Sequence, residues 1–140
     1  NYGPYQFTEK LIPLFVSRLL NGEKVPLYGD GMNVRDWIHV DDNCRAINLV
    51  AASGKAGEIY NIGGNHEVSN KEITEQLLAL TGKDWDSVEL VADRLGHDLR
   101  YSMDDSKIKN ELGFMPTWEF VKGLAETVDW YRENQARWDT

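Results

Sequence analysis

Residues 58–81 have the sequence EIYNIGGNHEVSNKEITEQLLALT, in which a strand pattern leads into a helix pattern. The β-branched and aromatic residues of 58–62 predict a strand that ends at a Gly-Gly turn. Ser69 and Glu72 match the S-x-x-E capping box ahead of an apolar stripe, which predicts a helix over 70–81. A strand that leads into a helix indicates α/β architecture.

The rest of the chain alternates between the same two patterns. The expected elements are helices at about 12–20 and 42–53, a short helix between Asp105 and Gly113, a last helix after Pro116, and extended segments at 25–28, 34–40 and 88–91. Because the strands are few and far apart, we expect these residues to form only part of a sheet.

The sequence also predicts where these elements begin and which faces they bury. Pro26 makes the segment 25–28 an edge strand or a non-strand. Asp41 or Asp42 is expected to cap the helix at 42–53, and Asp105 the short helix. The residues expected to face inward are Cys44, Ile47, Val50 and Ala51 in the first of these helices, and Val121, Leu124, Val128 and Tyr131 in the last helix.

Composition excludes several classes of function. The 140 residues carry a formal net charge of −8, so the overall field of the molecule repels nucleic acid. No apolar run approaches the roughly 20 residues that cross a bilayer, which predicts a soluble protein. The single cysteine, Cys44, permits no internal disulfide and fits a reducing cytoplasm. Its place on an apolar helix face predicts a buried, unreactive thiol.

The stretch DRLGHDLRY at 93–101 concentrates positive charge in this acidic chain. Arg94 and Arg100 are fork-shaped donors suited to phosphate oxygens, and His97 adds another donor. The alternative is a surface loop in which the arginines pair with Asp93 and Asp98.

A second basic motif, NVRDWIHVDD at 33–42, places Arg35 near Trp37. Arg35 could bind phosphate, or it could pair with Asp36 or Asp42. A pyrophosphate needs donors from several directions, so two separate arginine motifs together favour a diphosphate ligand.

Other patterns are less informative. The segment at 26–28 offers backbone amides and an aromatic ring that could hold a base, although most such tyrosines are simply packed. The Gly63-Gly64 turn lacks the G-x-G-x-x-G spacing of a dinucleotide loop. His39, His66 and His97 stand far apart, so we expect no metal site.

Six motifs occur in order along nearly the whole chain: NYGPYQ (1–6), EKLIP (9–13), PLYGDG (26–31), RDWIHVDD (35–42), YNIGG (60–64) and DRLGHD (93–98). Together they resemble the C-terminal part of the dTDP-glucose 4,6-dehydratases, which are extended short-chain dehydrogenases/reductases. The first motif would fit many nucleotide-sugar enzymes of that superfamily, whereas the second, fourth and sixth are similar to the dTDP-glucose branch.

The resemblance implies roles for particular residues. Leu95 stands where the family usually has proline. The implied substrate contacts are Lys10 and Leu11, the base-binding segment Pro26, Leu27 and Tyr28, the diphosphate ligand Arg35, and the further nucleotide contacts Asn70, Asp93, Arg94, Leu95, Gly96 and His97; Asn1 matches a residue near the NAD cofactor.

The resemblance further implies a larger enzyme, which oxidises C4 of dTDP-glucose with NAD, removes water across C5 and C6, and returns the hydride to C6. Residues 1–140 would form its C-terminal nucleotide-sugar-binding portion, mostly the substrate-binding domain, with about 40–64 belonging to the Rossmann sheet. The N-terminal NAD-binding region is then absent, in keeping with a chain that opens without methionine.

The family's catalytic residues would lie upstream, because no tyrosine in this sequence is followed by lysine four residues later. We therefore expect the 140 residues alone to be inactive, and the full-length enzyme to be a cytoplasmic homodimer. Three alternatives stay open: an epimerase or decarboxylase of the same superfamily that acts on another nucleotide sugar, a non-catalytic sugar-nucleotide sensor, and an acidic interaction domain without a ligand.

Overall fold

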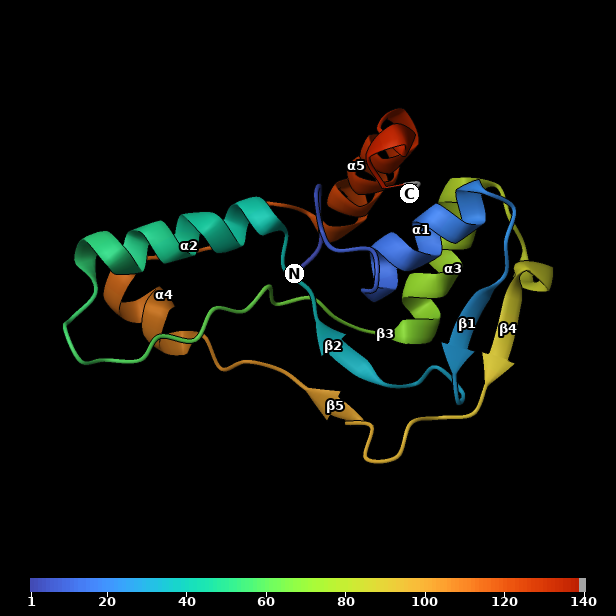
Figure 1. The fold of residues 1–140 in the computed structure, drawn as a ribbon. Helices are drawn as coiled ribbons and strands as arrows, with labels where there is room; N and C mark the ends of the chain where they lie inside the picture. The colour runs from blue at the N-terminus through green and yellow to red at the C-terminus, as the bar shows by residue number, and fades with distance from the viewer. Residues whose placement is uncertain (139–140) are drawn as a thin grey trace.

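The computed structural model describes residues 1–138 as a mixed α/β fold in which three helices pack beside two small sheets (Figure 1). The elements in chain order are α1 (Leu11–Leu20), β1 (Val25–Tyr28), β2 (Val34–Asp36), α2 (Val40–Ser53), β3 (Glu67–Ser69), α3 (Asn70–Thr81), the 3₁₀ turn η1 (Trp85–Ser87), β4 (Val88–Val91), β5 (Arg100–Tyr101), α4 (Ser106–Leu112), α5 (Phe120–Glu133) and the 3₁₀ turn η2 (Gln135–Arg137). The helices at 12–20 and 70–81 and the strands at 25–28 and 88–91 are confirmed.

The two sheets are short and separate. Strands β1 and β4 run parallel, with Val25 opposite Val88, and β1 has no other strand partner among the described residues. The position that Pro26 predicts, at a sheet edge, is therefore confirmed. In the second sheet β2 lies between β3 and β5, and its parallel register with β5 sets Arg35 opposite Tyr101. Only Val34–Asp36 of the expected extended segment 34–40 is a strand.

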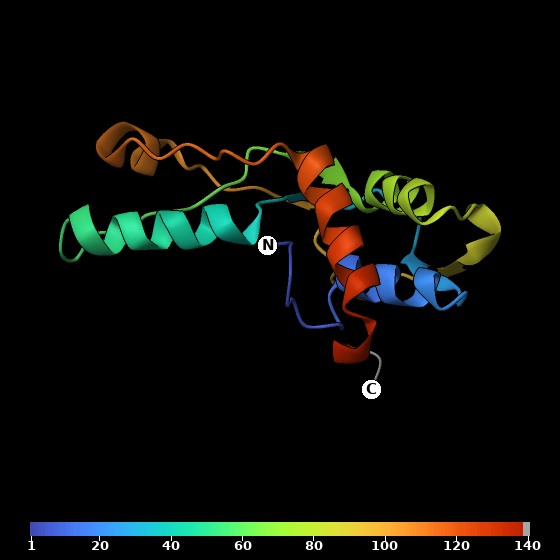
Figure 2. The same ribbon diagram turned by 90° about the horizontal axis from the view of Figure 1, so that it is seen from above.

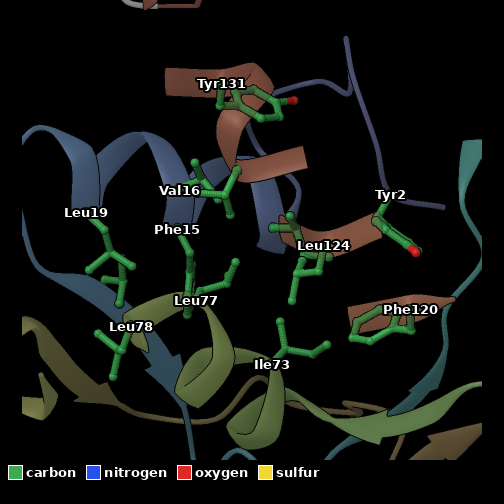
Figure 3. Packing of buried hydrophobic residues seen from close by; sticks show 13 residues of the cluster. Tyr2, Phe15, Val16, Leu19, Ile73, Leu77, Leu78, Phe120, Leu124 and Tyr131 are labelled. Atoms are coloured by element: carbon green, nitrogen blue, oxygen red, sulfur yellow. The ribbon is translucent and has the colours of Figure 1, made fainter. Parts of the chain in front are cut away.

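The main core lies where α1, α3 and α5 meet (Figure 3). The stripe of α1 supplies Phe15, Val16 and Leu19, all nearly inaccessible to solvent. Figure 3 shows Ile73, Leu77 and Leu78 of α3 and Leu124 and Tyr131 of α5 directed at the same interior, together with Tyr2 from the opening loop. The apolar periodicity of these helices is sufficient to explain this packing.

Two local signals hold α3 and α4 at their expected ends. Ser69 and Glu72 form the reciprocal capping box at the start of α3. Gly113 ends α4 in the left-handed conformation, with φ of 70°. Asp105 precedes α4 but makes no side-chain cap, because its carboxylate binds Lys109 and Asn65 instead.

Helix α2 and helix α4 form an arm that extends away from the main core (Figure 2). A second small cluster of Ile38, Ala46, Ile108 and Phe114 holds the arm together. The expected inner face of α2 is wrong at Cys44, Ile47 and Ala51, which are exposed, whereas Val50 is half-buried. The described residues cover α2 on one side only, so Cys44 is an accessible thiol and not a buried one.

The start of α2 also differs from the expectation. His39 is the N-cap, and its Nδ1 accepts a hydrogen bond from the backbone N–H of Asp41 at 3.2 Å. Asp42 is buried and turns toward the segment before α5. In α5 itself Leu124, Val128 and Tyr131 face inward as expected, but Val121 is 59% exposed and Phe120 is buried in its place.

The strand expected at 58–62 is absent from the described structure. The segment has no ladder partner and Ile59 is 80% exposed. Side chains fix it instead: the Tyr60 hydroxyl donates to Glu111 at 2.9 Å, and Lys107 donates to the carbonyl oxygen of Ile59 at 3.0 Å. A β-branched sequence becomes a strand only where a neighbouring backbone pairs with it, and residues 1–138 supply none here.

Candidate functional site

A groove between α1, β2 and the loop from β4 to β5 contains most of the expected site residues. Its larger hollow has a volume of about 580 Å³ and is lined by Asn1, Gln6, Glu9, Lys10, Leu11, Ile12, Arg35, Asp36, Trp37, Asn70, Arg94, His97 and Tyr101. A smaller hollow of about 200 Å³ shares Glu9, Leu11, Asn70, Arg94 and His97 with it and adds Leu14, Phe15, Pro26, Leu27 and Tyr28. The two hollows therefore adjoin and make one elongated groove.

Most of the side chains that line the groove lie at or near the ends of helices and strands. Lys10 is the N-cap residue of α1 and Leu11 its first residue, while Asn70 begins α3. Tyr28 is the last residue of β1, and Arg35 is the middle residue of β2. Residues as distant in the sequence as Asn1 and Tyr101 thus converge on one groove.

Arg35 keeps its charge available to the groove. Its Nη1 donates to the carbonyl oxygen of Val34 at 2.7 Å and its Nη2 to that of Asp98 at 2.9 Å. The guanidinium carbon lies 4.2 Å from the centre of the Tyr101 ring. Asp36 instead accepts from two backbone N–H groups, so the interpretation in which Arg35 pairs with Asp36 or Asp42 is wrong.

Arg94 lines both hollows of the groove. Its guanidinium is 5.2 Å from the centre of the Tyr28 ring, and its Nη2 is 3.0 Å from His97 Nε2. No carboxylate within residues 1–138 forms an ion pair with it. Two arginines from separate motifs therefore face one groove without a carboxylate partner.

Arg100 behaves differently from the expectation. It makes a two-pronged ion pair with Glu67, at 2.7 and 2.9 Å, and does not line the groove. Neither arginine of DRLGHDLRY forms an ion pair with Asp93 or Asp98 in the described structure, so the surface-loop alternative is wrong in its partners. Arg100 is nevertheless paired, with Glu67.

The remaining residues of the motif shape the loop. Gly96 has φ of 72°, and the backbone N–H of His97 donates to the Arg94 carbonyl at 3.2 Å, which makes a tight turn. Leu95 projects fully into solvent. The groove is not lined by Asp93, Leu95 or Gly96. Hydrogen bonds from the His97 ring and from the Arg94 backbone N–H lower the pKa of Asp93.

The charge of the groove favours an anion. Lys10, Arg35 and Arg94 contribute three positive charges against Glu9 and Asp36. Lys10 forms no ion pair with any carboxylate in the described part of the chain. Both oxygens of Asp36 are engaged by the N–H groups of Gly64 and His66, at 2.9 and 2.8 Å. The chemistry is that of a site for linked phosphates beside an apolar, aromatic end.

Sequence reasoning missed six residues that line the larger hollow: Gln6, Glu9, Ile12, Asp36, Trp37 and Tyr101. Gln6 Nε2 donates to the carbonyl oxygen of Asn1 at 2.8 Å, and Tyr101 stacks on Arg35. Their presence within the quoted motifs was the only available signal. Among residues 1–138 no group of three His, Cys, Asp or Glu side chains could hold a metal ion, and no helix is both long and apolar enough to cross a membrane.

Comparison with known proteins first defines the class. The structure matches the dTDP-glucose 4,6-dehydratase DesIV of Streptomyces venezuelae, solved with NAD and TYD bound, with a TM-score of 0.97 and 62% sequence identity over 99% of this chain and 43% of that one. It also matches UDP-glucose 4-epimerase of Thermotoga maritima, with a TM-score of 0.88 and 33% identity over 96% of this chain and 44% of that one. The fold is that of the extended short-chain dehydrogenases/reductases.

The family follows from the sequence comparison. The GDP-mannose 4,6 dehydratase family model matches residues 1–127, and the chain belongs to this family. It is 56% identical over 139 residues to a dTDP-glucose 4,6-dehydratase of Streptomyces niveus, covering 99% of this chain and 41% of that protein. The chain spans about two fifths of the length of the curated relatives that it matches.

Proposed function

We propose that this chain is the nucleotide-sugar-binding portion of an NAD-dependent dTDP-glucose 4,6-dehydratase, a lyase of deoxysugar biosynthesis that makes dTDP-4-keto-6-deoxyglucose. The observation that carries the proposal is the placement of Arg35 and Arg94 on one groove, neither of them neutralised by a carboxylate. The names of the similar proteins support the choice of nucleotide sugar.

The lining of the groove suggests how such a substrate lies. The small hollow bounded by Pro26, Leu27 and Tyr28 has the size and aromatic surface for the base. The diphosphate would lie between Arg35 and Arg94, where guanidinium donors approach from two directions. The residues to which we assign the other contacts are Lys10, Leu11, Asn70 and His97, which line the groove, and Asp93, Leu95 and Gly96, which shape its loop.

The NAD cofactor would be held mainly by a region outside this sequence. Asn1 lines the larger hollow and is the one residue here that we assign to the cofactor. The sequence has no Tyr-x-x-x-Lys pair, so we assign no chemical step to these residues and expect the 140 residues alone to be inactive. We also propose that about 40–64 joins the Rossmann sheet, and that the full-length enzyme is a cytoplasmic homodimer.

The test measures binding of thymidine diphosphate by calorimetry to the full-length protein and to three variants. Arg35→Ala and Arg94→Ala should each weaken binding by roughly 10- to 150-fold, the range for a hydrogen bond to a charged group. Arg100→Ala is the matched control, because Arg100 comes from the same sequence motif but is bound to Glu67 outside the groove. Its affinity should change by less than about threefold, as expected for an exposed ion pair.

Two results would contradict the proposal. The first is the absence of thymidine diphosphate binding by the unaltered protein. The second is an equal effect of all three substitutions, which would mean that the groove is not the anion site. Tighter binding of uridine or guanosine diphosphate would favour the alternative of an epimerase or decarboxylase on the same scaffold.

A further inference from the structure

His97 is hydrogen-bonded at both ring nitrogens. Its Nδ1 lies 2.6 Å from Asp93 Oδ1, and its Nε2 lies 3.0 Å from Arg94 Nη2. The imidazole side chain is only 6% exposed, whereas Asp93 is 44% exposed. These three side chains therefore form a linear chain of contacts that ends at a groove-facing guanidinium.

The identities of the end groups decide where the proton lies. A guanidinium carries donors and no acceptor, so Arg94 must donate and His97 Nε2 must accept. A neutral imidazole has one N–H, which is then on Nδ1 and donates to Asp93. Asp93 Oδ1 also accepts from the backbone N–H of Arg94 at 2.8 Å, which fixes the carboxylate.

We propose that Asp93 and His97 are positioning residues: Asp93 selects the Nδ1–H tautomer of His97, and His97 Nε2 then anchors Arg94 toward the phosphates. This inference rests on the proposed function, because it assigns the oriented guanidinium to the nucleotide diphosphate. Only one Nη group of Arg94 is used by His97, so the other N–H groups remain for the ligand.

The neutral anchor has an electrostatic consequence. A carboxylate in direct contact would cancel much of the charge of Arg94, whereas an imidazole orients the guanidinium without forming an ion pair with it. The carboxylate of Asp93 is separated from the Arg94 guanidinium by the His97 ring. Arg35 is held in a similar way, by carbonyl oxygens and the Tyr101 ring, so both arginines are oriented without an ion pair.

The Tyr28 ring completes the arrangement. It lies under the Arg94 guanidinium at 5.2 Å and meets the His97 ring edge-on, with the ring centres 6.5 Å apart. Since Tyr28 also lines the smaller hollow, the anchor connects the base end of the groove to the phosphate end. The Gly96 turn, with φ of 72°, brings residues 94 and 97 together.

The first experiment tests the tautomer without any ligand. Two-bond proton–nitrogen NMR correlations of the full-length protein, labelled at histidine, report which ring nitrogen of His97 carries the proton near pH 7.5. The expected signature is Nδ1–H in the unaltered protein and a shift toward Nε2–H in Asp93→Ala. An Nε2–H ring or an imidazolium in the unaltered protein would overturn the inference.

The second experiment measures thymidine diphosphate affinity in matched variants. His97→Leu removes the acceptor and should weaken binding by about tenfold, whereas His97→Gln keeps an oxygen that accepts from Arg94 and should bind within about threefold of the unaltered protein. Asp93→Ala should weaken binding, and Asp93→Asn should restore most of it because its amide oxygen can accept from Nδ1–H. Asp98→Asn is the loop control, since the Asp98 contact to Arg35 uses its backbone oxygen.

The two proposals fail in different ways. An unaltered protein that does not bind thymidine diphosphate contradicts the proposed function. A protein that binds normally and loses nothing in His97→Leu or Asp93→Ala contradicts the positioning role alone. Equal weakening in His97→Gln and His97→Leu does the same, because the accepting atom would then be irrelevant.

Discussion

Replacement of Asp42 by alanine should be among the most damaging single changes in this chain. Asp42 is 1% exposed and lies at the junction between α2 and the segment before α5. Its Oδ2 accepts from the backbone N–H groups of Thr117 and Trp118, both at 2.9 Å. Its Oδ1 accepts from the Thr117 hydroxyl at 2.9 Å and from Arg45 at 2.5 Å.

The expected cost follows from the donors that Asp42→Ala leaves behind. Two backbone N–H groups and a hydroxyl lose their partner. A buried donor left unpaired costs about 1–3 kcal/mol, but Thr117 is an exposed residue and Trp118 a half-buried one, so water can reach part of these donors. Arg45 loses its carboxylate but retains the Met115 carbonyl oxygen at 2.6 Å and can reach water. Since relaxation and water recover part of the loss, we expect the free energy of unfolding to fall by about 2–4 kcal/mol.

Urea unfolding near pH 7 measures this loss, with Asp41→Ala as the control. Asp41 is the neighbouring acidic residue in the same helical turn, but its side chain is 69% exposed, so its removal should cost less than about 1 kcal/mol. Equal losses in the two variants would refute the reasoning, because burial and hydrogen bonding would then not determine the cost.

The loss of stability at acid pH provides a second test of the role of Asp42. Burial raises the pKa of Asp42, but the hydrogen bonds from Arg45, Trp118 and Thr117 together lower it below the usual 3.8. The stabilisation is therefore complete above the usual pKa and is lost as the pH falls through the lower folded value. The difference between the unaltered chain and Asp42→Ala should shrink over that range.

Two further predictions concern other buried polar groups. The hydroxyl of Tyr2 is buried without a hydrogen-bond partner among the described residues, so Tyr2→Phe should leave the free energy of unfolding unchanged or raise it. Tyr131→Phe loses the hydrogen bond to the Gln6 carbonyl oxygen and should cost about 1 kcal/mol in urea unfolding. A larger loss of stability in Tyr2→Phe than in Tyr131→Phe would contradict this. Burial lowers the pKa of His39 and of His66 from 6.5, so their contribution to stability is complete above that pH and declines as the pH falls below it. Urea titrations at pH 8 and pH 6 should show lower stability at pH 6, and a flat profile would show that neither ring stays neutral on folding.

The sequence alone determined the features that depend on near neighbours. The capping box of Ser69 and Glu72, the left-handed stop at Gly113 and the apolar stripe of α1 all act within a few residues, so their patterns are complete in the sequence. The edge position implied by Pro26 has the same origin, since a missing N–H is a property of the residue itself. The motifs that resemble the dehydratases likewise consist of consecutive residues and can be recognised in the sequence.

Only the tertiary structure decided which residues of the same type line the groove and which form ion pairs elsewhere. Nothing local distinguishes Arg94 from Arg100, but the register of β5 beside β2 sends Arg100 to Glu67 and leaves Arg94 on the groove. The same register places Tyr101 against Arg35. Pairing between distant segments sets these outcomes, and the sequence of one segment carries no record of its partner.

The errors at α2 and at 58–62 have the same physical cause. An apolar stripe shows that a helix has a face to bury, but the elements packed against it determine which residues are covered, and here Ala46 is buried while Cys44 and Ile47 are exposed. A β-branched run such as 58–62 needs a neighbouring backbone before it becomes a strand. Periodicity and caps are properties of the chain, whereas burial and strand pairing are properties of the assembled fold.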